Sequence, residues 1–379
     1  MKFVLTCGGT AGHINPALAV AGRLRELFPE SEFLFLGAEG KMEMLLVPKA
    51  GYEIRALPIT NISRGKSLGA VLHNVDTVKN VLLSRRLTHR ILKEFKPDAV
   101  IGTGGYVCYP VLMEAAAMHI PTAVHESNAV PGLTTRMLAE HVDRIFLGFE
   151  ESRNHYPRPE KLSVTGTPVR GEFARYTKAA AKAQLGLEPD QKLVVSVWGS
   201  LGSGMMNDIF CRMLPLLRGQ KDFRLIHAIG SRDYRDVCAR IREEGLEPSD
   251  CGADAREYIF DMPRVMAAAD LLLCRAGAST LSELSYMGKP AILIPSPNVT
   301  NHHQEKNARV LEQAGAARVL LEGEFDENSL LALVKELLAD ETRLNAMSAA
   351  SASLAVPDAT DKICGEILDL IPSGQKKHF

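Results

Sequence analysis

Three glycine-rich segments of the sequence could each hold a negatively charged group. They are Cys7–His13, Gly102–Tyr106 and Trp198–Ser203, and each directly follows a short apolar run of β-strand type. Glycine lets a backbone approach a phosphate closely, and the helix after such a turn presents free N–H groups and the positive end of its dipole. A single segment of this kind is about as often a tight turn without a ligand as it is a binding site. Three of them at the carboxyl ends of strands favour an anionic ligand, bound in a cleft between two domains.

Motifs that would assign a different chemistry are absent from the sequence. None of the three segments reads G-x-G-x-x-G or G-x-x-x-x-G-K-[ST], which disfavours NAD-dependent enzymes and P-loop nucleotidases. The seven cysteines have no C-x-x-C spacing, so they are predicted to be reduced thiols of a cytosolic protein rather than metal or redox ligands. No Asp-x-Asp pair is present to hold a divalent ion on a diphosphate.

The elements that would position these segments follow a repeating pattern. Short apolar runs, typical of buried strands in a parallel sheet, alternate with longer segments of helical period. Strands are predicted at Phe3–Thr6, Glu32–Leu36, Ala99–Gly102, Thr122–His125, Arg144–Leu147, Leu193–Trp198, Arg224–Ile229, Leu271–Cys274, Ala291–Ile294 and Arg318–Leu321. Helices are predicted at Pro16–Phe28, Met205–Leu217, Tyr234–Glu243, Thr280–Tyr286 and Gln304–Gln313. This α/β pattern indicates two successive doubly wound, Rossmann-like domains.

The length and the local composition suggest where these domains begin and end. At about 150 residues per domain, 379 residues predict two. The polar segment Ser152–Lys161 and the turn Thr165–Pro168 mark a boundary. We therefore expect an N-terminal domain over 1–168 and a C-terminal domain over 169–352. A last helix, from 353, should return to the N-terminal domain before a frayed tail that ends at 379.

The charge and hydropathy of the chain exclude other classes of partner. With 44 basic and 45 acidic residues the formal net charge is −1, so no general field attracts nucleic acid and none is expected to bind. No stretch approaches the roughly 20 apolar residues of a membrane-spanning helix. The apolar run at the N-terminus is too short for a secretory signal. We expect a soluble protein that can still touch a membrane surface.

Six segments resemble motifs of glycosyltransferase family 28, and in particular of its peptidoglycan N-acetylglucosaminyltransferases. In chain order they are Gly8–Ala19, Gly102–Val107, His125–Asn128, Gly199–Gly202, Cys274–Glu283 and Asn301–Ala308. The matches keep the family's order from residue 3 to about residue 320, nearly the whole chain. Each motif alone is a weak signal, but six in register are specific. Trp198 departs from the family pattern, which usually has glycine there.

The resemblance implies a fold, an activity and two substrates. The fold would be of the GT-B type, with two Rossmann-like domains facing across a cleft. The activity would be inverting transfer of N-acetylglucosamine (GlcNAc) from UDP-GlcNAc to the 4-hydroxyl of MurNAc-pentapeptide-pyrophosphoryl-undecaprenol (lipid I), giving lipid II for peptidoglycan. No cofactor and no metal are expected, because helix dipoles and Arg170 could replace the ion on the diphosphate.

The family's binding residues carry over to matching positions in this sequence. Glu283 would accept hydrogen bonds from the ribose hydroxyls, although Thr280–Glu283 also fits a capping box that would begin a helix. For the remainder of UDP-GlcNAc the resemblance indicates Thr10, Ala11, Gly12, Asn128, Arg170, Ser200, Ile259, Ala278, Ser279, Thr280, Leu281, Ser282 and Gln304. For the acceptor and its pyrophosphate it indicates Gly104, Gly105 and Tyr106.

Two side chains are candidates for the general base that inverting transfer requires. His13 lies in the first glycine segment and could take the proton of the acceptor hydroxyl. A lone histidine is more often structural, but its place in this segment favours His13. Glu126 is the second candidate, with His125 orienting it. The sequence leaves the choice between His13 and Glu126 open.

A predicted helix in the first half has an apolar stripe with basic neighbours. The stripe contains Leu68, Val71, Leu72, Val75, Val78 and Leu82, and the basic residues around it are Arg64, Lys66, Lys79, Arg85, Arg86 and Arg90. Such a stripe either faces the protein core or contacts anionic lipid headgroups. Because the family acts on a lipid-linked acceptor, we expect a cytoplasmic protein that is peripheral on the inner face of the cell membrane.

Three other functions remain possible at this stage. A UDP-GlcNAc 2-epimerase would share the fold and the nucleotide, but no carboxylates are apparent that could act at C2 and C3 of the sugar. Another lipid glycosyltransferase of the same family would differ at the segment His125–Asn128, which resembles the peptidoglycan branch. A non-catalytic UDP-sugar-binding subunit would be expected to retain one half of the site.

Overall fold

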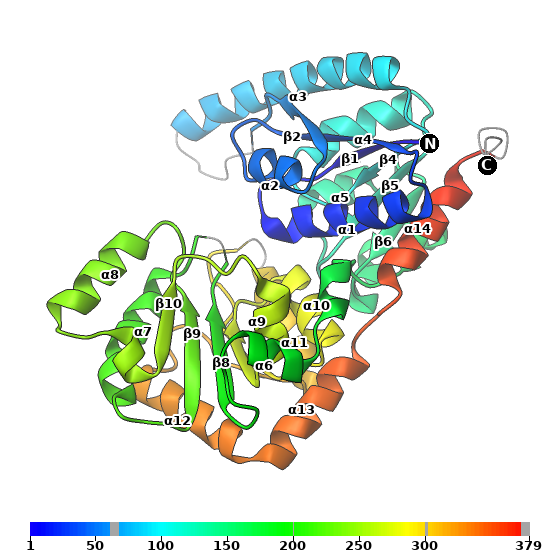
Figure 1. Cartoon of the computed structure of the whole chain (residues 1–379). Helices are drawn as coiled ribbons and strands as arrows, with labels where there is room; N and C mark the ends of the chain where they lie inside the picture. The colour runs from blue at the N-terminus through cyan, green and yellow to red at the C-terminus, as the bar shows by residue number, and fades with distance from the viewer. Residues whose placement is uncertain (61–67, 200, 300–301, 373–379) are drawn as a thin grey trace. The chain divides into compact units, whose positions relative to one another are not determined.

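The computed structural model describes residues 1–60, 68–199, 201–299 and 302–372, with the backbone alone for 68–75. The chain forms two compact units (Figure 1). Unit 1 contains Met1–Arg170 and Val356–Phe379, and unit 2 contains Gly171–Ala355. The chain therefore leaves unit 1 after Arg170 and returns to it for its last helix, close to the boundaries at 168 and 353 that the sequence suggested.

Unit 1 is built on a seven-stranded parallel sheet in the order β3-β2-β1-β4-β5-β6-β7. Its strands are β1 (Lys2–Thr6), β2 (Glu32–Ala38), β3 (Glu53–Leu57), β4 (Ala99–Gly102), β5 (Thr122–Glu126), β6 (Arg144–Leu147) and β7 (Leu162–Val164). Its α-helices are α1 (Ala11–Leu27), α2 (Glu43–Lys49), α3 (Leu68–Phe95), α4 (Cys108–Ala117), α5 (Leu133–Leu138) and α14 (Ala359–Leu370). This strand order is that of a doubly wound Rossmann-type fold.

Alternate residues of the central strand β1 enter two different parts of the core of unit 1. Phe3 and Leu5 pack with residues of α1 and α14, whereas Val4 packs with residues of α4. Side chains alternate across a strand, so an unbroken apolar run is buried only when helices cover both faces of the sheet. Helix α14 lies against α1, where Arg23 pairs with Asp361 at 2.6 Å (Figure 1).

Unit 2 is built on a six-stranded parallel sheet in the order β10-β9-β8-β11-β12-β13. Its strands are β8 (Lys192–Val197), β9 (Phe223–Ala228), β10 (Ala253–Arg256), β11 (Leu271–Cys274), β12 (Ala291–Leu293) and β13 (Ala317–Val319). Its α-helices are α6 (Lys178–Gln184), α7 (Gly204–Leu217), α8 (Tyr234–Glu243), α9 (Met262–Ala268), α10 (Ala278–Tyr286), α11 (His303–Gln313), α12 (Glu327–Ala339) and α13 (Glu341–Ser353). The six strands of unit 2 therefore have the same order as the first six of unit 1, and both units have the doubly wound architecture that the sequence predicted.

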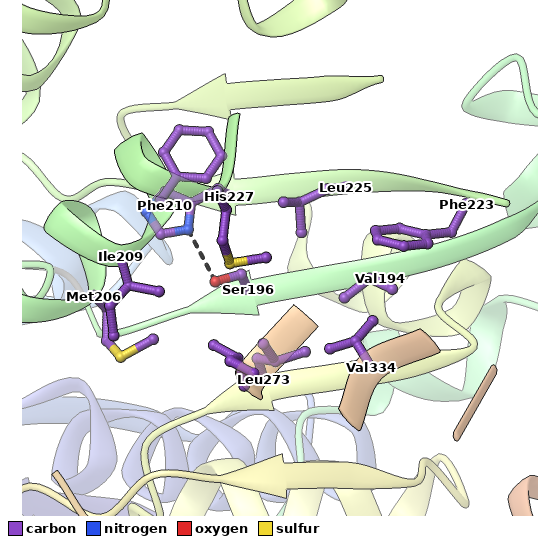
Figure 2. A pocket seen from close by; sticks show the side chains of 12 residues that line it. Val194, Ser196, Met206, Ile209, Phe210, Phe223, Leu225, His227, Leu273 and Val334 are labelled. Carbon is purple, nitrogen blue, oxygen red and sulfur yellow. Dashed lines mark hydrogen bonds between the residues drawn. The ribbon is translucent and has the colours of Figure 1, made fainter. Parts of the chain in front are cut away.

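The core of unit 2 encloses a small cavity beside β8 and β9 (Figure 2). Apolar side chains such as Met206, Phe210 and Leu273 form most of its wall, and Ser196 and His227 are its polar members. Its volume of about 20 Å³ suits about one water molecule. The cavity belongs to the core and is far too small for a nucleotide-sugar.

The strands that were not predicted from the sequence all lie at the edges of the sheets. β4, β6 and β11 have the predicted bounds. β3, β7 and β10 were not predicted, and each forms an edge of its sheet. An edge strand is partly exposed, so it lacks the continuous apolar run that marks a buried strand. Helix α1 also differs from the prediction, since it begins at Ala11 rather than at Pro16.

Part of the predicted apolar and basic face near α3 lies outside the described residues. Arg64 and Lys66 fall there, and the side chains of Leu68, Val71, Leu72 and Val75 are not described. Of the later members, Val78 is 62% exposed and Leu82 is 57% exposed. Thr77, Ser84, Thr88 and Leu92 of the same helix are buried. The described end of the stripe therefore faces away from the core.

Candidate active site

Each sheet has one point where the direction of winding reverses, and the glycine-rich segments lie at both points. In unit 1 the reversal is between β1 and β4, which are followed by Cys7–His13 and Thr103–Tyr106. In unit 2 it is between β8 and β11, which are followed by Trp198–Ser203 and Arg275–Gly277. Open α/β sheets bind ligands at the carboxyl ends of the strands at such a switch point. Each unit therefore has one candidate ligand site.

The two glycine segments of unit 1 pack directly against each other. The backbone N–H of Gly8 donates to the carbonyl of Gly104 at 3.2 Å. A Cβ atom on Gly105 would lie 2.4 Å from the oxygen of Gly8, and one on Gly104 would lie 2.5 Å from Cδ2 of His13. Both glycines also have positive φ values, of +111° for Gly104 and +90° for Gly105. A side chain at Gly105 would therefore require the backbone of Gly8 to move, and one at Gly104 would displace the ring of His13.

The hydrogen bond between His13 and Gly8 defines which ring nitrogen carries the proton. Nδ1 of His13 lies 2.8 Å from the carbonyl oxygen of Gly8. A carbonyl only accepts, so Nδ1 must donate, and in the neutral ring Nε2 keeps the free lone pair. The sequence placed His13 in a loop, but the side chain belongs to the first turn of α1 and is half-buried. The hydroxyl of Thr103 fixes that turn by donating to the carbonyl of His13 at 2.6 Å.

The carboxylate of Glu126 is engaged by its own loop. It is 4% exposed. It accepts hydrogen bonds from the backbone and side-chain nitrogens of Asn128, at 3.0 and 2.9 Å, and from the backbone N–H of Gly132 at 2.9 Å. These bonds hold the loop that follows β5. They also place Asn128, a predicted sugar ligand, directly beside Glu126.

His125 is a neutral side chain of the core of unit 1. Burial lowers the pKa of His125 to about 4. Its Nε2 donates to the carbonyl of Gly166 at 3.0 Å, and its Nδ1 accepts from the hydroxyl of Ser127 at 3.2 Å. The predicted role of orienting Glu126 has no support in these bonds, which join His125 to the segment after β7.

Tyr106 has a buried hydroxyl next to the two packed glycine segments. Within the described part of the chain this oxygen has no hydrogen-bond partner. Burial, and to a lesser degree the charge of Glu43, raise the pKa of Tyr106, so the hydroxyl stays protonated. A buried donor without a partner costs free energy unless a ligand or water completes it. Tyr106 thus fits the predicted contact with the acceptor.

The glycine segment of unit 2 is supported by a chain of neutral polar side chains. The indole N–H of Trp198 donates to Ser196 at 2.9 Å, and Ser196 Oγ lies 2.9 Å from Nδ1 of His227 (Figure 2). Nε2 of His227 lies 3.0 Å from the side-chain oxygen of Asn207. Burial lowers the pKa of His227 to about 3. Each group in this series therefore donates to the next one in the direction of Asn207, and none of these four side chains carries a charge.

Arg275 joins the two ligand segments of unit 2, and sequence reasoning missed it. One guanidinium nitrogen donates to the hydroxyl of Ser203 at 2.8 Å, and another lies 2.6 Å from the carboxylate of Glu322. The guanidinium carbon lies 5.7 Å from the centre of the Trp198 ring. Its position in the Cys274–Glu283 motif is the signal that could have identified it. Ser200, a predicted phosphate ligand, lies outside the described residues.

The helices after the ligand segments have N-termini that no side chain satisfies. In the described structure α1, α4, α7 and α10 have no side-chain cap and no acidic residue in the first turn. Helices α5 and α9 also lack both, whereas α6, α12 and α13 are capped by Thr177, Asp326 and Asp340. Uncapped N–H groups together with the helix dipole suit a bound anion.

The start of helix α10 tests the capping-box interpretation of Thr280–Glu283. The helix begins at Ala278 with Gly277 at its N-cap position. The capping box at Thr280–Glu283 is therefore wrong, because these residues lie inside the helix. Glu283 is 8% exposed. The predicted phosphate-binding run Ala278–Ser282 coincides with the first turn of α10 and the start of its second.

Comparisons with known protein families agree with this geometry. The model of the glycosyltransferase family 28 N-terminal domain matches residues 3–147, and that of the family's C-terminal domain matches residues 193–363. The chain belongs to glycosyltransferase family 28. It is 40% identical over 371 residues to a UDP-N-acetylglucosamine–N-acetylmuramyl-(pentapeptide) pyrophosphoryl-undecaprenol N-acetylglucosamine transferase of Acetivibrio thermocellus, with 98% of each chain covered. A Bacillus cereus protein of the same name is 39% identical and covers 96% of this chain and 97% of its own.

Solved structures show the same architecture as this family 28 chain. The crystal structure of MurG from Acinetobacter baumannii has a TM-score of 0.71 and 26% identity, covering 97% of this chain and all of that one. A UDP-GlcNAc 2-epimerase from Neisseria meningitidis, bound to UDP-GlcNAc, has a TM-score of 0.66 but 16% identity, covering 97% of this chain and 100% of the epimerase. The second likeness concerns the fold alone. Both structures agree with the predicted GT-B class.

Other family positions lie at the ends of strands and helices in unit 2. Gln304 is in the first turn of α11, and its side-chain oxygen accepts the N–H of Ser296 at 2.9 Å, so its amide nitrogen is the group it can offer to a sugar. Ile259 is buried between the exposed Tyr258 and Phe260 in the loop after β10. Arg170 is the last residue of unit 1 before the chain enters unit 2.

Two further properties of the described residues bear on ligands and membranes. No group of three or more histidine, cysteine, aspartate or glutamate side chains among them could hold a metal ion. None of the helices, as far as the chain is described, combines the length and the apolar character needed to cross a bilayer.

Proposed function

We propose that the protein transfers GlcNAc from UDP-GlcNAc to the 4-hydroxyl of lipid I, with inversion, and so forms lipid II. The observation that carries this proposal is the 40% identity, over 98% of both chains, to a transferase named for this reaction. Identity at that level over nearly the whole length favours the peptidoglycan transferase over another lipid glycosyltransferase. The 2-epimerase alternative is weaker, because its representatives share the fold at 16% identity.

Most of the residues that we assign to the donor belong to unit 2, and Asn128, Arg170 and the start of α1 in unit 1 complete the set. Glu283 would accept hydrogen bonds from the ribose hydroxyls, and the uncapped N-termini of α7 and α10 would receive the diphosphate. The backbone of Ile259 would bind uracil, and Gln304 and Asn128 would bind the sugar hydroxyls. Arg170 and Ser200 would donate to phosphate oxygens. A cation and several fixed N–H dipoles can stabilise the charge of the departing UDP without a metal ion.

Unit 1 is the half that we assign to the acceptor and the base. Thr10, the N-cap residue of α1, and Ala11 and Gly12, its first two residues, would contact UDP-GlcNAc, whereas Gly104, Gly105 and Tyr106 would contact the acceptor's pyrophosphate. His13 is the better base, because Nε2 keeps a free lone pair while the oxygens of Glu126 already accept three hydrogen bonds. Nε2 would take the proton of the 4-hydroxyl as that oxygen attacks C1 of GlcNAc. The C1–oxygen bond to UDP breaks on the opposite face, which inverts the configuration.

The deciding experiment is transfer of labelled GlcNAc from UDP-GlcNAc to a short-chain lipid I analogue in detergent with excess EDTA. We expect a disaccharide-containing product at a rate that EDTA does not change. Loss of activity in EDTA, restored by a divalent ion, would contradict the metal-free mechanism. UDP-GlcNAc binding without transfer, together with formation of UDP-ManNAc, would support the epimerase instead.

We also propose that the outer face of α3 binds the anionic inner surface of the cell membrane, so that the protein is a peripheral cytoplasmic enzyme. Val78 and Leu82 are exposed there beside the exposed basic residues Lys79, Arg86 and Arg90. Apolar side chains that enter the interface and cations that contact anionic headgroups bind a membrane together.

Vesicle flotation tests this membrane surface. Vesicles that contain phosphatidylglycerol should retain the wild-type protein, and Leu82→Glu should reduce the bound fraction several-fold without changing the melting temperature. Leu216→Glu is the matched control, since Leu216 is an exposed leucine of unit 2. Equal binding of both variants would exclude this face of α3 as the membrane contact.

A further inference from the structure

Glu43 is a buried charged side chain to which the proposed mechanism gives no role. It is the first residue of α2 and is fully buried. Its Oε2 accepts the backbone N–H of Gly9 at 3.0 Å, and its Oε1 accepts the backbone N–H of Ala38 at 3.0 Å. Each carboxylate oxygen thus has a backbone donor, in the pattern of an ionised group.

The surrounding glycines make room for this carboxylate. A Cβ atom on Gly8 would lie 2.9 Å from Oε1 of Glu43, and one on Gly37 would lie 2.6 Å from its Cγ. Burying a carboxylate is costly unless hydrogen bonds compensate it. Gly37 in β2, Gly8 after β1 and the two N–H donors therefore form a specific recess for one negative charge, directly under the first glycine segment.

A single peptide group connects Glu43 to His13. The N–H of Gly9, which donates to Glu43, and the carbonyl of Gly8, which accepts from Nδ1 of His13 at 2.8 Å, belong to the same planar peptide bond. The imidazole donates to the peptide oxygen and the peptide nitrogen donates to the carboxylate. Hydrogen bonds aligned in one direction polarise and strengthen one another.

We propose that Glu43 is a positioning residue for His13 and acts through the Gly8–Gly9 peptide. This inference rests on the proposed function, in which His13 is the general base. The carboxylate draws the Gly9 N–H toward itself and makes the Gly8 oxygen a stronger acceptor. That oxygen holds the proton on Nδ1 and leaves Nε2 free to take the proton of the acceptor hydroxyl. It also stabilises the positive ring that results.

The Glu43→Gln variant tests the connection with a small change of shape. The amide of glutamine turns an N–H donor toward one of the two backbone donors, so one hydrogen bond is lost together with the charge. We expect kcat to fall by about 10- to 100-fold, as for other residues that orient a reacting group, while KM for UDP-GlcNAc stays the same. A purely structural role would instead lower the melting temperature and leave kcat of the folded fraction unchanged.

Nitrogen-15 NMR of the histidine rings gives a readout that does not depend on activity. The wild-type protein should show His13 as the Nδ1–H tautomer at high pH, and Glu43→Gln should show a mixture of both tautomers. The matched control is Asp98→Asn, since Asp98 accepts the backbone N–H of Lys2 at 2.7 Å at the opposite end of β1. That variant should keep both the tautomer and kcat.

A double variant completes the test. If Glu43 acts through His13, adding Glu43→Gln to His13→Ala should cause no further loss of kcat. An additional 10-fold loss, or an unchanged tautomer in Glu43→Gln, overturns the proposal. If Glu43→Gln does not fold, the wild type decides, because an Nε2–H tautomer of His13 overturns the proposal as well. Failure of transferase activity in the wild type would refute the proposed function and leave the tautomer result standing.

Discussion

The two switch points hold their glycine segments with side chains of opposite electrostatic character. In unit 1 the backbone of the first glycine segment donates to the buried carboxylate of Glu43, after β2, and the neighbouring loop after β5 donates to the buried carboxylate of Glu126. In unit 2 the corresponding support is a chain of neutral groups from Trp198 to Asn207, together with the guanidinium of Arg275. The same strand order therefore has a carboxylate beneath the first glycine segment of unit 1, and neutral side chains with a guanidinium paired to Glu322 beside the glycine segment of unit 2.

The difference fits the chemistry proposed for each half. In unit 1 the carboxylate of Glu43 and the ring of His13 bind the same peptide group, which holds the ring with Nε2 free. A carboxylate beneath a diphosphate would repel the ligand, and a buried histidine that became charged would be costly. The one-way bonds around His227 keep that ring neutral. Two copies of one fold can thus divide proton transfer and anion binding between them.

Removing the base should produce the largest effect in the molecule. We expect His13→Ala to lower kcat by about 10²- to 10⁴-fold, the usual contribution of a positioned general base. The affinity for UDP-GlcNAc should stay within about two-fold of wild type, since no contact with the donor is assigned to the side chain of His13. Turnover with saturating substrates measures the first quantity, and calorimetric titration measures the second.

Glu126→Gln provides the opposing test for the base. Its three hydrogen bonds indicate that the variant should disturb the loop up to Gly132 and weaken sugar binding through Asn128, with a smaller loss of kcat than His13→Ala. Near-normal turnover in His13→Ala combined with loss of turnover in Glu126→Gln would falsify the assignment of charges made here for unit 1.

The next effect should appear in donor binding alone. Glu283→Gln removes a charged acceptor of two ribose hydroxyls, and hydrogen bonds to charged groups are worth about 1.5 to 3 kcal/mol. The Kd of UDP-GlcNAc should therefore rise about 10- to 100-fold, whereas kcat at saturating donor changes little. Trp198 is the single tryptophan of the chain and adjoins the glycine segment of unit 2, so its fluorescence can follow binding. An unchanged Kd would remove Glu283 from the site.

Local features of the sequence were sufficient to predict the fold and the positions of the glycine segments at the ends of strands. Buried strands such as β4 and β11 appear as unbroken apolar runs, and glycine clusters mark the turns that follow β1 and β8. His13 could be selected because it stands within such a cluster. Its tautomer could not, because it depends on the carbonyl of Gly8, and a bond between a side chain and a backbone atom leaves no pattern in residue types.

The residues that support the site escaped prediction because their partners are distant in the chain. Glu43 meets Gly9 across 34 residues, and Arg275 meets Ser203 across 72. In the sequence, Glu43 belongs to no predicted element or motif and nothing distinguishes it from other acidic residues. Its burial follows from the pairing of β1 with β2 and from the missing side chains of Gly8 and Gly37. Such information exists only once the sheet has formed.

Lowering the pH should destabilise the two units over different pH ranges, because each contains a buried neutral histidine. The pKa of His227 is lowered by burial from 6.5 to about 3, and that of His125 from 6.5 to about 4. Between pH 6.5 and its lowered pKa, each histidine binds a proton in the unfolded chain but not in the folded chain. The free energy of unfolding is therefore unaffected by protonation of these histidines above pH 6.5. Below pH 6.5 it falls by between about 1 and 1.5 kcal/mol per pH unit for each histidine. His125 stops contributing near pH 4, whereas His227 continues toward pH 3.

Matched variants isolate these two contributions. Denaturant unfolding followed by Trp198 fluorescence reports on unit 2, and hydrogen exchange of β5 reports on unit 1. His227→Gln should flatten the pH dependence of the Trp198 signal and leave that of β5 unchanged, and His125→Gln should do the reverse. Identical pH profiles for wild type and His227→Gln would mean that His227 becomes protonated in the folded state.

The smallest effect should distinguish the two serines that donate to these rings. Ser127→Ala removes the partner of Nδ1 in His125, so one buried acceptor is left unpaired. Ser196→Ala leaves two groups unpaired, Nδ1 of His227 and the indole N–H of Trp198. At roughly 1 kcal/mol for each unpaired group, the losses in the free energy of unfolding should be about 1 and about 2 kcal/mol. Circular dichroism during urea unfolding measures both.

Equal losses would mean that a water molecule in the cavity beside Ser196 replaces its hydroxyl, which a space of about 20 Å³ permits. The neutral chain of unit 2 would then tolerate a missing member, in contrast to the direct contacts between backbone and carboxylate in unit 1.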